Sequence, residues 1–310
     1  MCRLSHVAYT VEVSRDAAHS GTKRRVNLTQ LAERITVDTF RWAPTDLYST
    51  VVGWGARQRV PRRLRAPLYG AFARAVSARL DEAGAPLPEY RSFGDFFART
   101  LKPGARPVDA AAIVAPCDGV IAAAGPVVDG MLVQAKGIDY SLAELLTVPS
   151  LAAALAGGEF ATVYLSPKDY HRVHAPCDGE VVAYHYVPGQ RWPVSPRFSR
   201  TVDRLLAINE RVVIELRTAW GPVAVVMVAA TAVGNVWLTH LGDDTRVWRG
   251  AREPRHVAMS ARVKAGDELG AFLLGSTVVQ VTPPAAPRLA AVAENAVVRC
   301  GQALVGKEAR

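Results

Sequence analysis

Two features of this sequence could carry chemistry: a Gly-Ser pair inside an apolar segment, and two histidines three residues apart. The pair Gly275-Ser276 interrupts the apolar run Gly270–Val279, where a packed strand should not tolerate a small polar break. Glycine accepts backbone conformations closed to other residues, so the Gly275 carbonyl can lie open to attack by the Ser276 hydroxyl. That attack would convert the amide to an ester, and loss of the serine α-proton would then cut the chain. The new N-terminal residue would become a pyruvoyl ketone. An isolated Gly-Ser pair is more often a simple turn, so other residues must support this interpretation.

The two histidines, His171 and His174, lie in the polar segment Tyr164–Pro176. Imidazole takes or gives a proton near neutral pH, as both a self-cleaving serine and a decarboxylated carbanion require. A zinc site is an alternative, because His171, His174 and Cys177 are evenly spaced and Cys117 is available. We expect no metal, because both cysteines occupy otherwise identical turns, as inheritance from a repeat would produce.

That repeat consists of Ala115–Gly119 and Ala175–Gly179, two Ala-Pro-Cys-Asp-Gly segments sixty residues apart. Each predicts a turn that starts a strand. The default role of Asp118 and Asp178 is a contact within their own turn. If the two halves face each other, one of these carboxylates could orient a histidine and complete an acid, base and nucleophile set with Ser276.

The elements that must position these residues are strands. Short Val, Ile and Ala runs punctuated by Gly and Pro fill residues 105–310, with one helical interlude at Ser141–Leu155. The segment Lys264–Gly270 resembles a turn of biotinyl and lipoyl carrier domains. We therefore expect an α+β protein, mainly β, in which N-terminal amphipathic helices precede a duplicated β-sandwich or flattened barrel with pseudo-symmetric halves.

The N-terminal third has a different character. Residues 1–40 show no sustained periodicity, and we expect them to be an extension; residues 41–104 form a basic helical region. Apolar residues recur every four positions at Leu64, Leu68, Phe72, Val76 and Leu80. With Trp54 before them, they predict one helix over about Trp54–Leu80. Arginines flank this stripe, and no acidic residue occurs from Leu47 to Leu80. The pattern favours a helix in a bilayer interface, although a helix docked on the protein's own core has a similar pattern. A second, short helix is expected to begin at Phe93 and to end before Lys102.

Composition sets limits on the functions. The chain has 310 residues, 50% of them hydrophobic, which is enough for a large core, and its net charge is +9. Because the excess of basic residues lies in 41–110, we expect an anionic surface as partner and no nucleic acid. The longest apolar run, Val223–Val233, is too short to span a bilayer. Four cysteines in a chain of this size, without a secretory leader, favour a reducing, cytoplasmic setting.

These motifs together resemble the phosphatidylserine decarboxylase family over roughly residues 42–300. The resemblance rests mainly on Phe272–Val279, which contains the family's Leu-Gly-Ser-Thr processing site, on Tyr164–Pro176 and on Gln134–Leu142. Shorter matches add to it: Phe93–Arg99, Arg106–Asp109 and Asn209–Val212.

The resemblance implies a proenzyme cleaved between Gly275 and Ser276 into a β chain (1–275) and an α chain (276–310) that stay together as a heterodimer, which could pair further. It implies a self-processing triad of Asp118, His174 and Ser276, with His174 as base and Asp118 holding its tautomer. His171 would assist decarboxylation by protonating the product. The pyruvoyl group made from Ser276 would form a Schiff base with phosphatidylserine and yield phosphatidylethanolamine and carbon dioxide. The enzyme would act as a peripheral protein on the cytoplasmic face of the cell membrane.

Two rival functions remain open from the residues alone. One is a zinc hydrolase that uses His171, His174 and a cysteine or aspartate. The other is a carrier or lipid-surface binding module that has the turns without the chemistry. Metal analysis distinguishes the first from the decarboxylase, and reagents that trap a ketone distinguish the second.

Overall fold

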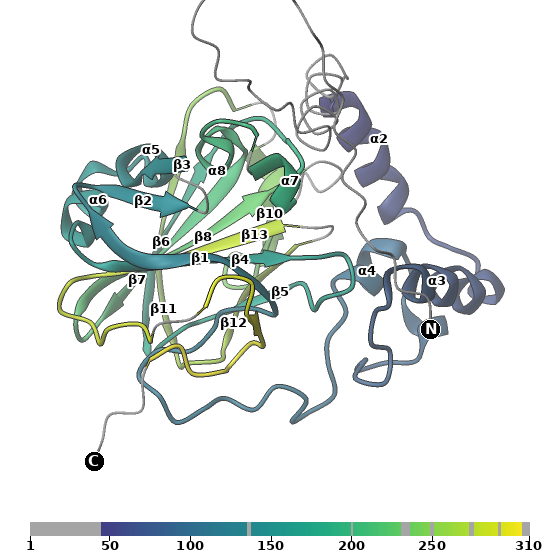
Figure 1. Cartoon of the computed structure of the whole chain (residues 1–310). Helices are drawn as coiled ribbons and strands as arrows, with labels where there is room; N and C mark the ends of the chain where they lie inside the picture. The colour runs from purple at the N-terminus through teal and green to yellow at the C-terminus, as the bar shows by residue number, and fades with distance from the viewer. Residues whose placement is uncertain are drawn as a thin grey trace, which may run out of the picture. The chain divides into compact units, whose positions relative to one another are not determined.

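The structure is a computed structural model, and it describes residues 45–134, 138–199, 201–230, 236–248, 251–272, 276–290 and 293–305. The expected extension at residues 1–40 and the carbonyl of Gly275 lie outside these ranges. The described residues contain an N-terminal helical segment and a body made mainly of antiparallel strands (Figure 1). The prediction of a mainly β, α+β protein is thus confirmed. Likeness to biotinyl and lipoyl domains, and the duplication that it implies, stay predictions.

The single helix predicted over Trp54–Leu80 is wrong, because the structure has two helices there. Helix α2 spans Thr45–Arg57 and helix α3 spans Arg62–Val76. Pro61 stands at the N-cap of α3, where its fixed backbone angle suits a helix start but cannot continue an earlier helix. The left-handed conformation of Ser77 (φ 60°) ends α3, so Leu80 lies beyond the helix.

The inner face of α3 packs on an aromatic cluster. Tyr69 and Ala73 are buried there with Tyr90 and Phe96, and the rings of Tyr69 and Phe96 stack with centroids 4.9 Å apart. Leu64 and Leu68 stay exposed on the same helix. One face of α3 therefore covers a core, as the docked-helix interpretation expects, and the bilayer interpretation stays a prediction.

The remaining N-terminal elements lead into the β body. The turn of 3-10 helix η1 spans Leu87–Glu89, and helix α4 spans Phe93–Phe97, as predicted. A capping box fixes the start of α4: Ser92 Oγ accepts from the Asp95 N–H, and the Asp95 carboxylate accepts from the Ser92 N–H.

The body contains two sheets. The larger has ten strands in the order β11-β6-β7-β8-β13-β4-β1-β2-β3, with β14 paired to β1. Its strands are β1 (Gly119–Val128), β2 (Met131–Gln134), β3 (Ile138–Ser141), β4 (Glu159–Leu165), β6 (Gly179–Val187), β7 (Arg211–Thr218), β8 (Gly221–Ala229), β11 (Arg255–Val263), β13 (Ser276–Thr282) and β14 (Val297–Val298). The smaller sheet has the order β10-β9-β12-β5 and contains β5 (Arg172–His174), β9 (Val236–Leu238), β10 (Asp243–Asp244) and β12 (Glu268–Phe272).

Short helices connect the strands. The predicted helical interlude is present as two helices, α5 (Leu142–Leu146) and α6 (Pro149–Leu155), because Pro149 cannot continue the first and opens the second. The others are α7 (Pro196–Ser199), α8 (Leu205–Ile208) and the 3-10 helix η2 (Thr245–Trp248). Among the described residues, no helix is both long and apolar enough to cross a membrane.

The two repeated turns do start strands, as predicted. β1 begins at Gly119 and β6 begins at Gly179, the last residues of the two repeats. A side chain on Gly119 would lie 2.4 Å from the Tyr164 carbonyl oxygen, and one on Gly179 would lie 2.7 Å from that of Arg217. Glycine is needed at both positions because a neighbouring strand passes too close for a Cβ atom.

The apolar run Gly270–Val279 forms two strands that belong to different sheets. β12 ends at Phe272 in the small sheet, and β13 begins at Ser276 in the large one, so the predicted junction is where the chain changes sheets. All seven residues of β13 are buried, between β4 and β8. Ser276 therefore starts a central strand, and that position would hold it in place even after the peptide bond before it is cut.

Candidate active site

Ser276 is fully buried at the first position of β13. It pairs with Leu165 of β4 on one side and with Ala229 of β8 on the other. Its Oγ has no hydrogen-bond partner among the residues that the structure describes. A buried polar group normally has a partner, and exceptions concentrate where a group is kept for chemistry.

His171 is held close to the strand that leads to this serine. Its carbonyl accepts a hydrogen bond of 2.8 Å from the N–H of Phe272, the last residue of β12. Its Nδ1 lies 2.8 Å from the Asp169 carbonyl, which can only accept, so Nδ1 carries the proton of the neutral ring. Nε2 is buried with no partner in the described part of the chain, and the ring packs on Phe97 with centroids 4.1 Å apart.

The protonation state of His171 follows from this position. Burial lowers its pKa to about 3, and the charge of Arg99 acts in the same direction, against the hydrogen bond to the Asp169 carbonyl. The ring is therefore neutral at pH 7, with a free lone pair on Nε2. His171 can accept a proton there, and it can give one only after it has first taken one.

His174, on β5, has partners at both ring nitrogens. Nδ1 lies 2.8 Å from the Gly266 carbonyl and therefore carries the proton, while Nε2 lies 3.0 Å from the Tyr170 hydroxyl and accepts from it. Burial lowers the pKa of His174, and the hydrogen bond to Gly266 partly offsets that effect. The lone pair of His174 thus faces Tyr170.

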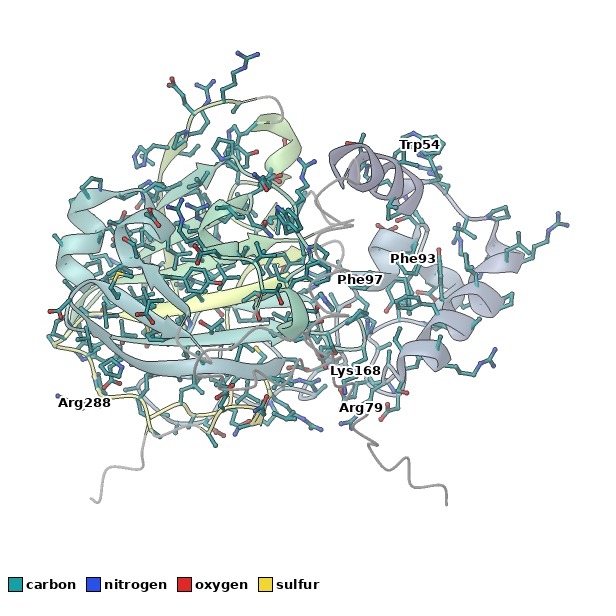
Figure 2. The ribbon with its side chains drawn as sticks, turned by 45° about the horizontal axis from the view of Figure 1, so that its top comes forward. Trp54, Arg79, Phe93, Phe97, Lys168 and Arg288 are labelled. Atoms are coloured by element: carbon teal, nitrogen blue, oxygen red, sulfur yellow. The ribbon has the colours of Figure 1, made fainter. Side chains whose placement is uncertain are left out.

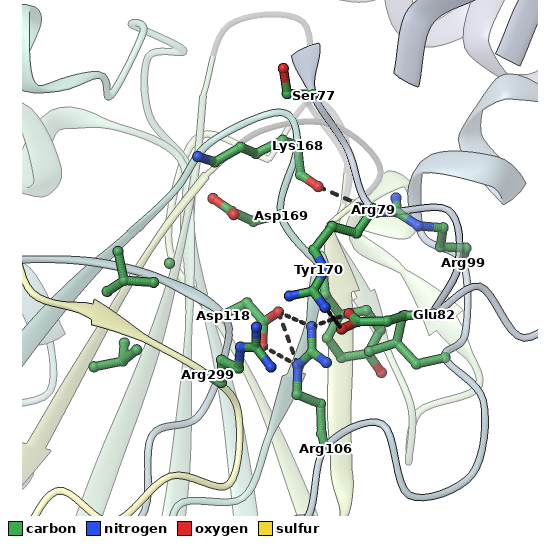
Figure 3. A pocket seen from close by; sticks show the side chains of 14 residues that line it. Ser77, Arg79, Glu82, Arg99, Arg106, Asp118, Lys168, Asp169, Tyr170 and Arg299 are labelled. Carbon is green, nitrogen blue, oxygen red and sulfur yellow. Dashed lines mark hydrogen bonds and ion pairs between the residues drawn. The ribbon is translucent and has the colours of Figure 1, made fainter. Parts of the chain in front are cut away.

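Asp118 is buried in a network that joins three parts of the chain. Its carboxylate accepts from Arg106 Nε at 2.8 and 3.0 Å and from the Cys300 N–H at 2.9 Å. Arg106 also binds Glu82 at 2.9 Å, so one guanidinium lies between two carboxylates (Figure 3). Because Cys300 belongs to 276–310, this carboxylate links the two segments on either side of the expected cleavage point.

The structure places Asp118 and Ser276 near one end of the large sheet and His174 in the small sheet, and no hydrogen bond joins the three among the described residues. Val120 and Thr277 both pair with Tyr164, on opposite sides, so Asp118 and Ser276 lie near the same level. Two strand spacings separate them, about 10 Å. Both ring nitrogens of His174 are engaged elsewhere, so the tautomer that Asp118 was expected to hold is instead fixed by the Gly266 carbonyl. Asp118 still acts on His174 through its charge, which offsets a small part of the lowering of the His174 pKa by burial.

The zinc alternative needs several ligand side chains close together. Where the structure describes the chain, no group of three or more His, Cys, Asp or Glu side chains could hold a metal ion. Burial raises the pKa of the Cys177 and Cys300 thiols to about 12 and that of Cys117 well above its usual value. These thiols are therefore neutral in the metal-free protein.

Comparison with known proteins agrees with these motifs. A model of the family described as phosphatidylserine decarboxylase matches residues 93–306. The chain is 43% identical over 281 residues to a protein named phosphatidylserine decarboxylase proenzyme from Anaeromyxobacter sp. (strain K), an alignment that covers 88% of this chain and 99% of the relative. The chain belongs to the phosphatidylserine decarboxylase family. A relative of the same name from Myxococcus xanthus (strain DK1622) is 40% identical over 84% of this chain and 93% of its own length.

Within this phosphatidylserine decarboxylase family member, the structure adds residues that sequence reasoning did not select. Tyr170 binds His174, and Arg106 binds Asp118. Both stood inside segments that carried the family resemblance, but neither had been given a role. The Gly266 carbonyl could not have been found from side-chain types, because any residue offers a carbonyl there.

One prediction concerns the stability that Asp118 provides. Asp118→Asn removes the charge of one of the two carboxylates that Arg106 binds in a buried network, and we expect the free energy of unfolding to fall by about 2 kcal/mol. Asp178→Asn is the matched control: Asp178 occupies the equivalent turn but is exposed and accepts only from the Ala265 N–H, which an amide oxygen also satisfies. Denaturant unfolding of both variants measures the difference. Equal losses in the two would contradict this account of the network.

Proposed function

We propose that this chain decarboxylates phosphatidylserine to phosphatidylethanolamine and carbon dioxide, after cleaving itself between Gly275 and Ser276. The observation that carries the proposal is Ser276, a buried hydroxyl with no partner among the described residues, placed where a family processing motif changes sheets. Family membership supplies the substrate class. The products of cleavage are a β chain (1–275) and an α chain (276–310), held together by the pairing of β13 with β4 and β8.

The residues around Ser276 fit a pyruvoyl group at that position. The side chain of Ser276 is buried at the start of a central strand, so a ketone formed there would be shielded from bulk water. Once formed, such a group supplies an electron sink for the loss of carbon dioxide. No protein side chain has this property, which is why the serine must be converted.

Self-cleavage needs a base and an attacked carbonyl. The Ser276 hydroxyl gives up its proton and attacks the Gly275 carbonyl carbon; the C–N bond breaks, and the serine nitrogen takes a proton as the ester forms. Loss of the serine α-proton then expels the Gly275 carboxylate and leaves a dehydroalanine at position 276. Its imine form adds water and releases ammonia, which gives the pyruvoyl ketone. His174 serves as the base in this proposal. Because the Tyr170 hydroxyl occupies its lone pair, the serine proton must pass through Tyr170 or displace it. The Asp118 carboxylate favours the imidazolium through its charge.

His171 acts in the later reaction. Its Nε2 has a free lone pair, so it takes a proton from the substrate ammonium as the amine becomes a nucleophile. It then returns this proton to the substrate α carbon after carbon dioxide has left. Burial lowers the pKa of His171 and so opposes this protonation, which means that the ring holds the proton only briefly before it passes to carbon.

The direct test is a product analysis. Purified protein is mixed with phosphatidylserine vesicles, and the lipids are examined by mass spectrometry. We expect phosphatidylethanolamine to form, hydroxylamine to abolish its formation by trapping a ketone, and a chelator to have no effect. A protein that binds vesicles without converting the lipid would instead be a lipid-surface module.

Access to a membrane lipid requires a surface that binds a bilayer, and we assign this to α2 and α3. Trp54, labelled in Figure 2, is 60% exposed. Leu68 is 49% exposed, and Val51 and Leu64 are exposed on the same two helices. Exposed arginines accompany them, among them Arg62 and Arg63. Apolar side chains beside arginines fit the boundary of an anionic bilayer. We place the enzyme as a peripheral protein on the cytoplasmic face of the cell membrane.

The double variant Trp54→Ala, Leu68→Ala tests this surface. Because both side chains are exposed, the free energy of unfolding should change little, whereas affinity for anionic vesicles should fall roughly tenfold or more. Vesicle sedimentation measures the affinity. Val128→Ala removes an exposed apolar side chain from β1 and should leave binding unchanged. Equal binding by all three proteins would show that the bilayer contacts another surface.

A further inference from the structure

A pocket of about 200 Å³ lies beside Asp118, and basic side chains dominate its wall (Figure 3). Five cationic and three acidic residues line it: Arg79, Arg99, Arg106, Lys168 and Arg299, with Glu82, Asp118 and Asp169. Three segments contribute, one before β1, the loop between β4 and β5, and the stretch around β14. The pocket therefore carries a net positive charge in a partly enclosed space.

The acidic residues are already engaged. Glu82 and Asp118 pair with Arg106, and Glu82 also pairs with Arg79 at 2.8 Å. The Asp169 carboxylate accepts from the N–H and the hydroxyl of Ser166. Three cations remain, and in the described part of the chain none of them forms an ion pair: Arg99, Lys168 and Arg299.

Arg99 is the unusual member of the three, because it is only 3% exposed. Its Nη2 donates a long hydrogen bond of 3.3 Å to the Lys168 carbonyl, its guanidinium lies over the Phe96 ring, and its buried Nε has no partner within the described residues. Glu82, Asp118 and Asp169 act on Arg99 only through their charge. A buried cation without an ion-pair partner is costly unless an anion joins it.

We propose that this pocket is an anion subsite that takes the phosphodiester of the substrate head group, with Arg99 as its central ligand and Lys168 and Arg299 at its mouth. The identity of the substrate rests on the function proposed above. Guanidinium groups match phosphate oxygens in geometry and charge. The three cations without ion pairs would thereby gain a common partner.

The position of the pocket suits this ligand. In a serine phosphodiester, four single bonds separate nitrogen from phosphorus, a span of about 5 Å. Asp118, on the pocket wall, and Ser276 are two strand spacings apart, about 10 Å, so a head group whose nitrogen lies at Ser276 can extend its phosphate toward the pocket. The pocket is smaller than the usual site for a drug-sized ligand, so it can hold a head group while the acyl chains stay outside.

Arg99 also connects the pocket to His171. Burial mainly lowers the pKa of that ring, and the charge of Arg99 adds to the effect. The ring packs on Phe97, two residues before Arg99 in the chain. A phosphate bound to Arg99 would weaken this effect, and His171 would become a better proton acceptor when substrate is present.

Binding to the uncleaved protein tests the subsite without any need for the reaction. Full-length Ser276→Ala protein is titrated by calorimetry with glycerophosphoserine, glycerophosphoethanolamine, serine methyl ester and inorganic phosphate. We expect both glycerophosphodiesters to bind and serine methyl ester not to bind. Adding Arg99→Gln should weaken glycerophosphoserine binding roughly 10- to 100-fold. Arg288→Gln, at an exposed residue far from Lys168 and Arg79 in Figure 2, should leave it unchanged.

The other outcomes overturn the proposal. Binding by serine methyl ester equal to that of glycerophosphoserine would mean that the pocket binds the amine end of the ligand and not the phosphate. Binding by inorganic phosphate alone would indicate a site for the free ion. If Arg99→Gln does not fold, the double variant Lys168→Gln, Arg299→Gln carries the test, because both side chains are exposed; unchanged affinity there would refute the subsite. If the Ser276→Ala protein binds these ligands but the parent protein never cleaves itself, the result counts against the proposed function alone.

Discussion

Replacing Ser276 by alanine is expected to leave a single chain of 33.3 kDa that forms no phosphatidylethanolamine. Without the hydroxyl, nothing can attack the Gly275 carbonyl, and without cleavage no ketone can form. The loss should be complete, since the residue is the source of both the break and the reactive group. The fold should survive, because the removed oxygen has no hydrogen-bond partner among the described residues, and the free energy of unfolding should stay within about 1 kcal/mol of the parent value.

A denaturing gel and a lipid analysis measure this result. Ser260→Ala is the control, because Ser260 also lies in a strand of the large sheet, but its hydroxyl is at the surface and binds Glu180. That variant should cleave and react normally. A small C-terminal fragment from the Ser276→Ala protein would show that another residue starts the cleavage.

The second prediction with a large expected effect is that His171 and His174 act in different reactions. His171→Gln is expected to cleave itself but to decarboxylate 10²- to 10⁴-fold more slowly, the usual contribution of a positioned acid or base. His174→Gln is expected to remain uncleaved and therefore inactive. The reason lies in their surroundings: the buried Nε2 of His171 has no hydrogen-bond partner among the residues described, whereas Nε2 of His174 binds the Tyr170 hydroxyl.

Pulse labelling followed by gel analysis gives the cleavage rate, and product formation by the cleaved protein gives the decarboxylation rate. His256→Gln, at an exposed position on β11, should change neither. Loss of cleavage in His171→Gln together with normal cleavage in His174→Gln would reverse the two assignments. Because burial lowers the pKa of His171 to about 3, this ring stays neutral in the free protein as the pH falls from 7 to 4. The decarboxylation rate should therefore not fall in that pH range through protonation of His171.

The sequence was informative where chemistry depends on residue type and spacing. The Gly275-Ser276 pair could be identified because it breaks an apolar run, and the two repeated turns because each must start a strand with a glycine. The strands of the body were predictable as a class, from short apolar runs between Gly and Pro.

What could not be predicted depends on contacts between distant segments. Asp118 and Asp178 stand in identical turns, yet Asp118 contacts Arg106 and Cys300, whereas Asp178 accepts, within the described residues, from the Ala265 N–H alone. Nothing local distinguishes them. The hydrogen bond from His174 to the Gly266 carbonyl spans 92 residues and involves no recognisable side chain.

The division of the N-terminal helix was missed for a different reason. The four-residue spacing from Leu64 to Leu80 is a true helical pattern, but Pro61 and the left-handed Ser77 set the helix ends. Local backbone constraints decided the boundaries there, while apolar periodicity correctly indicated the element.

The central claim is that the peptide bond before Ser276 breaks and leaves a ketone in its place. Intact-mass spectrometry of the purified active protein tests this most directly. The account predicts two fragments, residues 1–275 and residues 276–310, the second with a blocked N-terminus whose mass matches a pyruvoyl group in place of serine. An active preparation containing only the intact chain would contradict it.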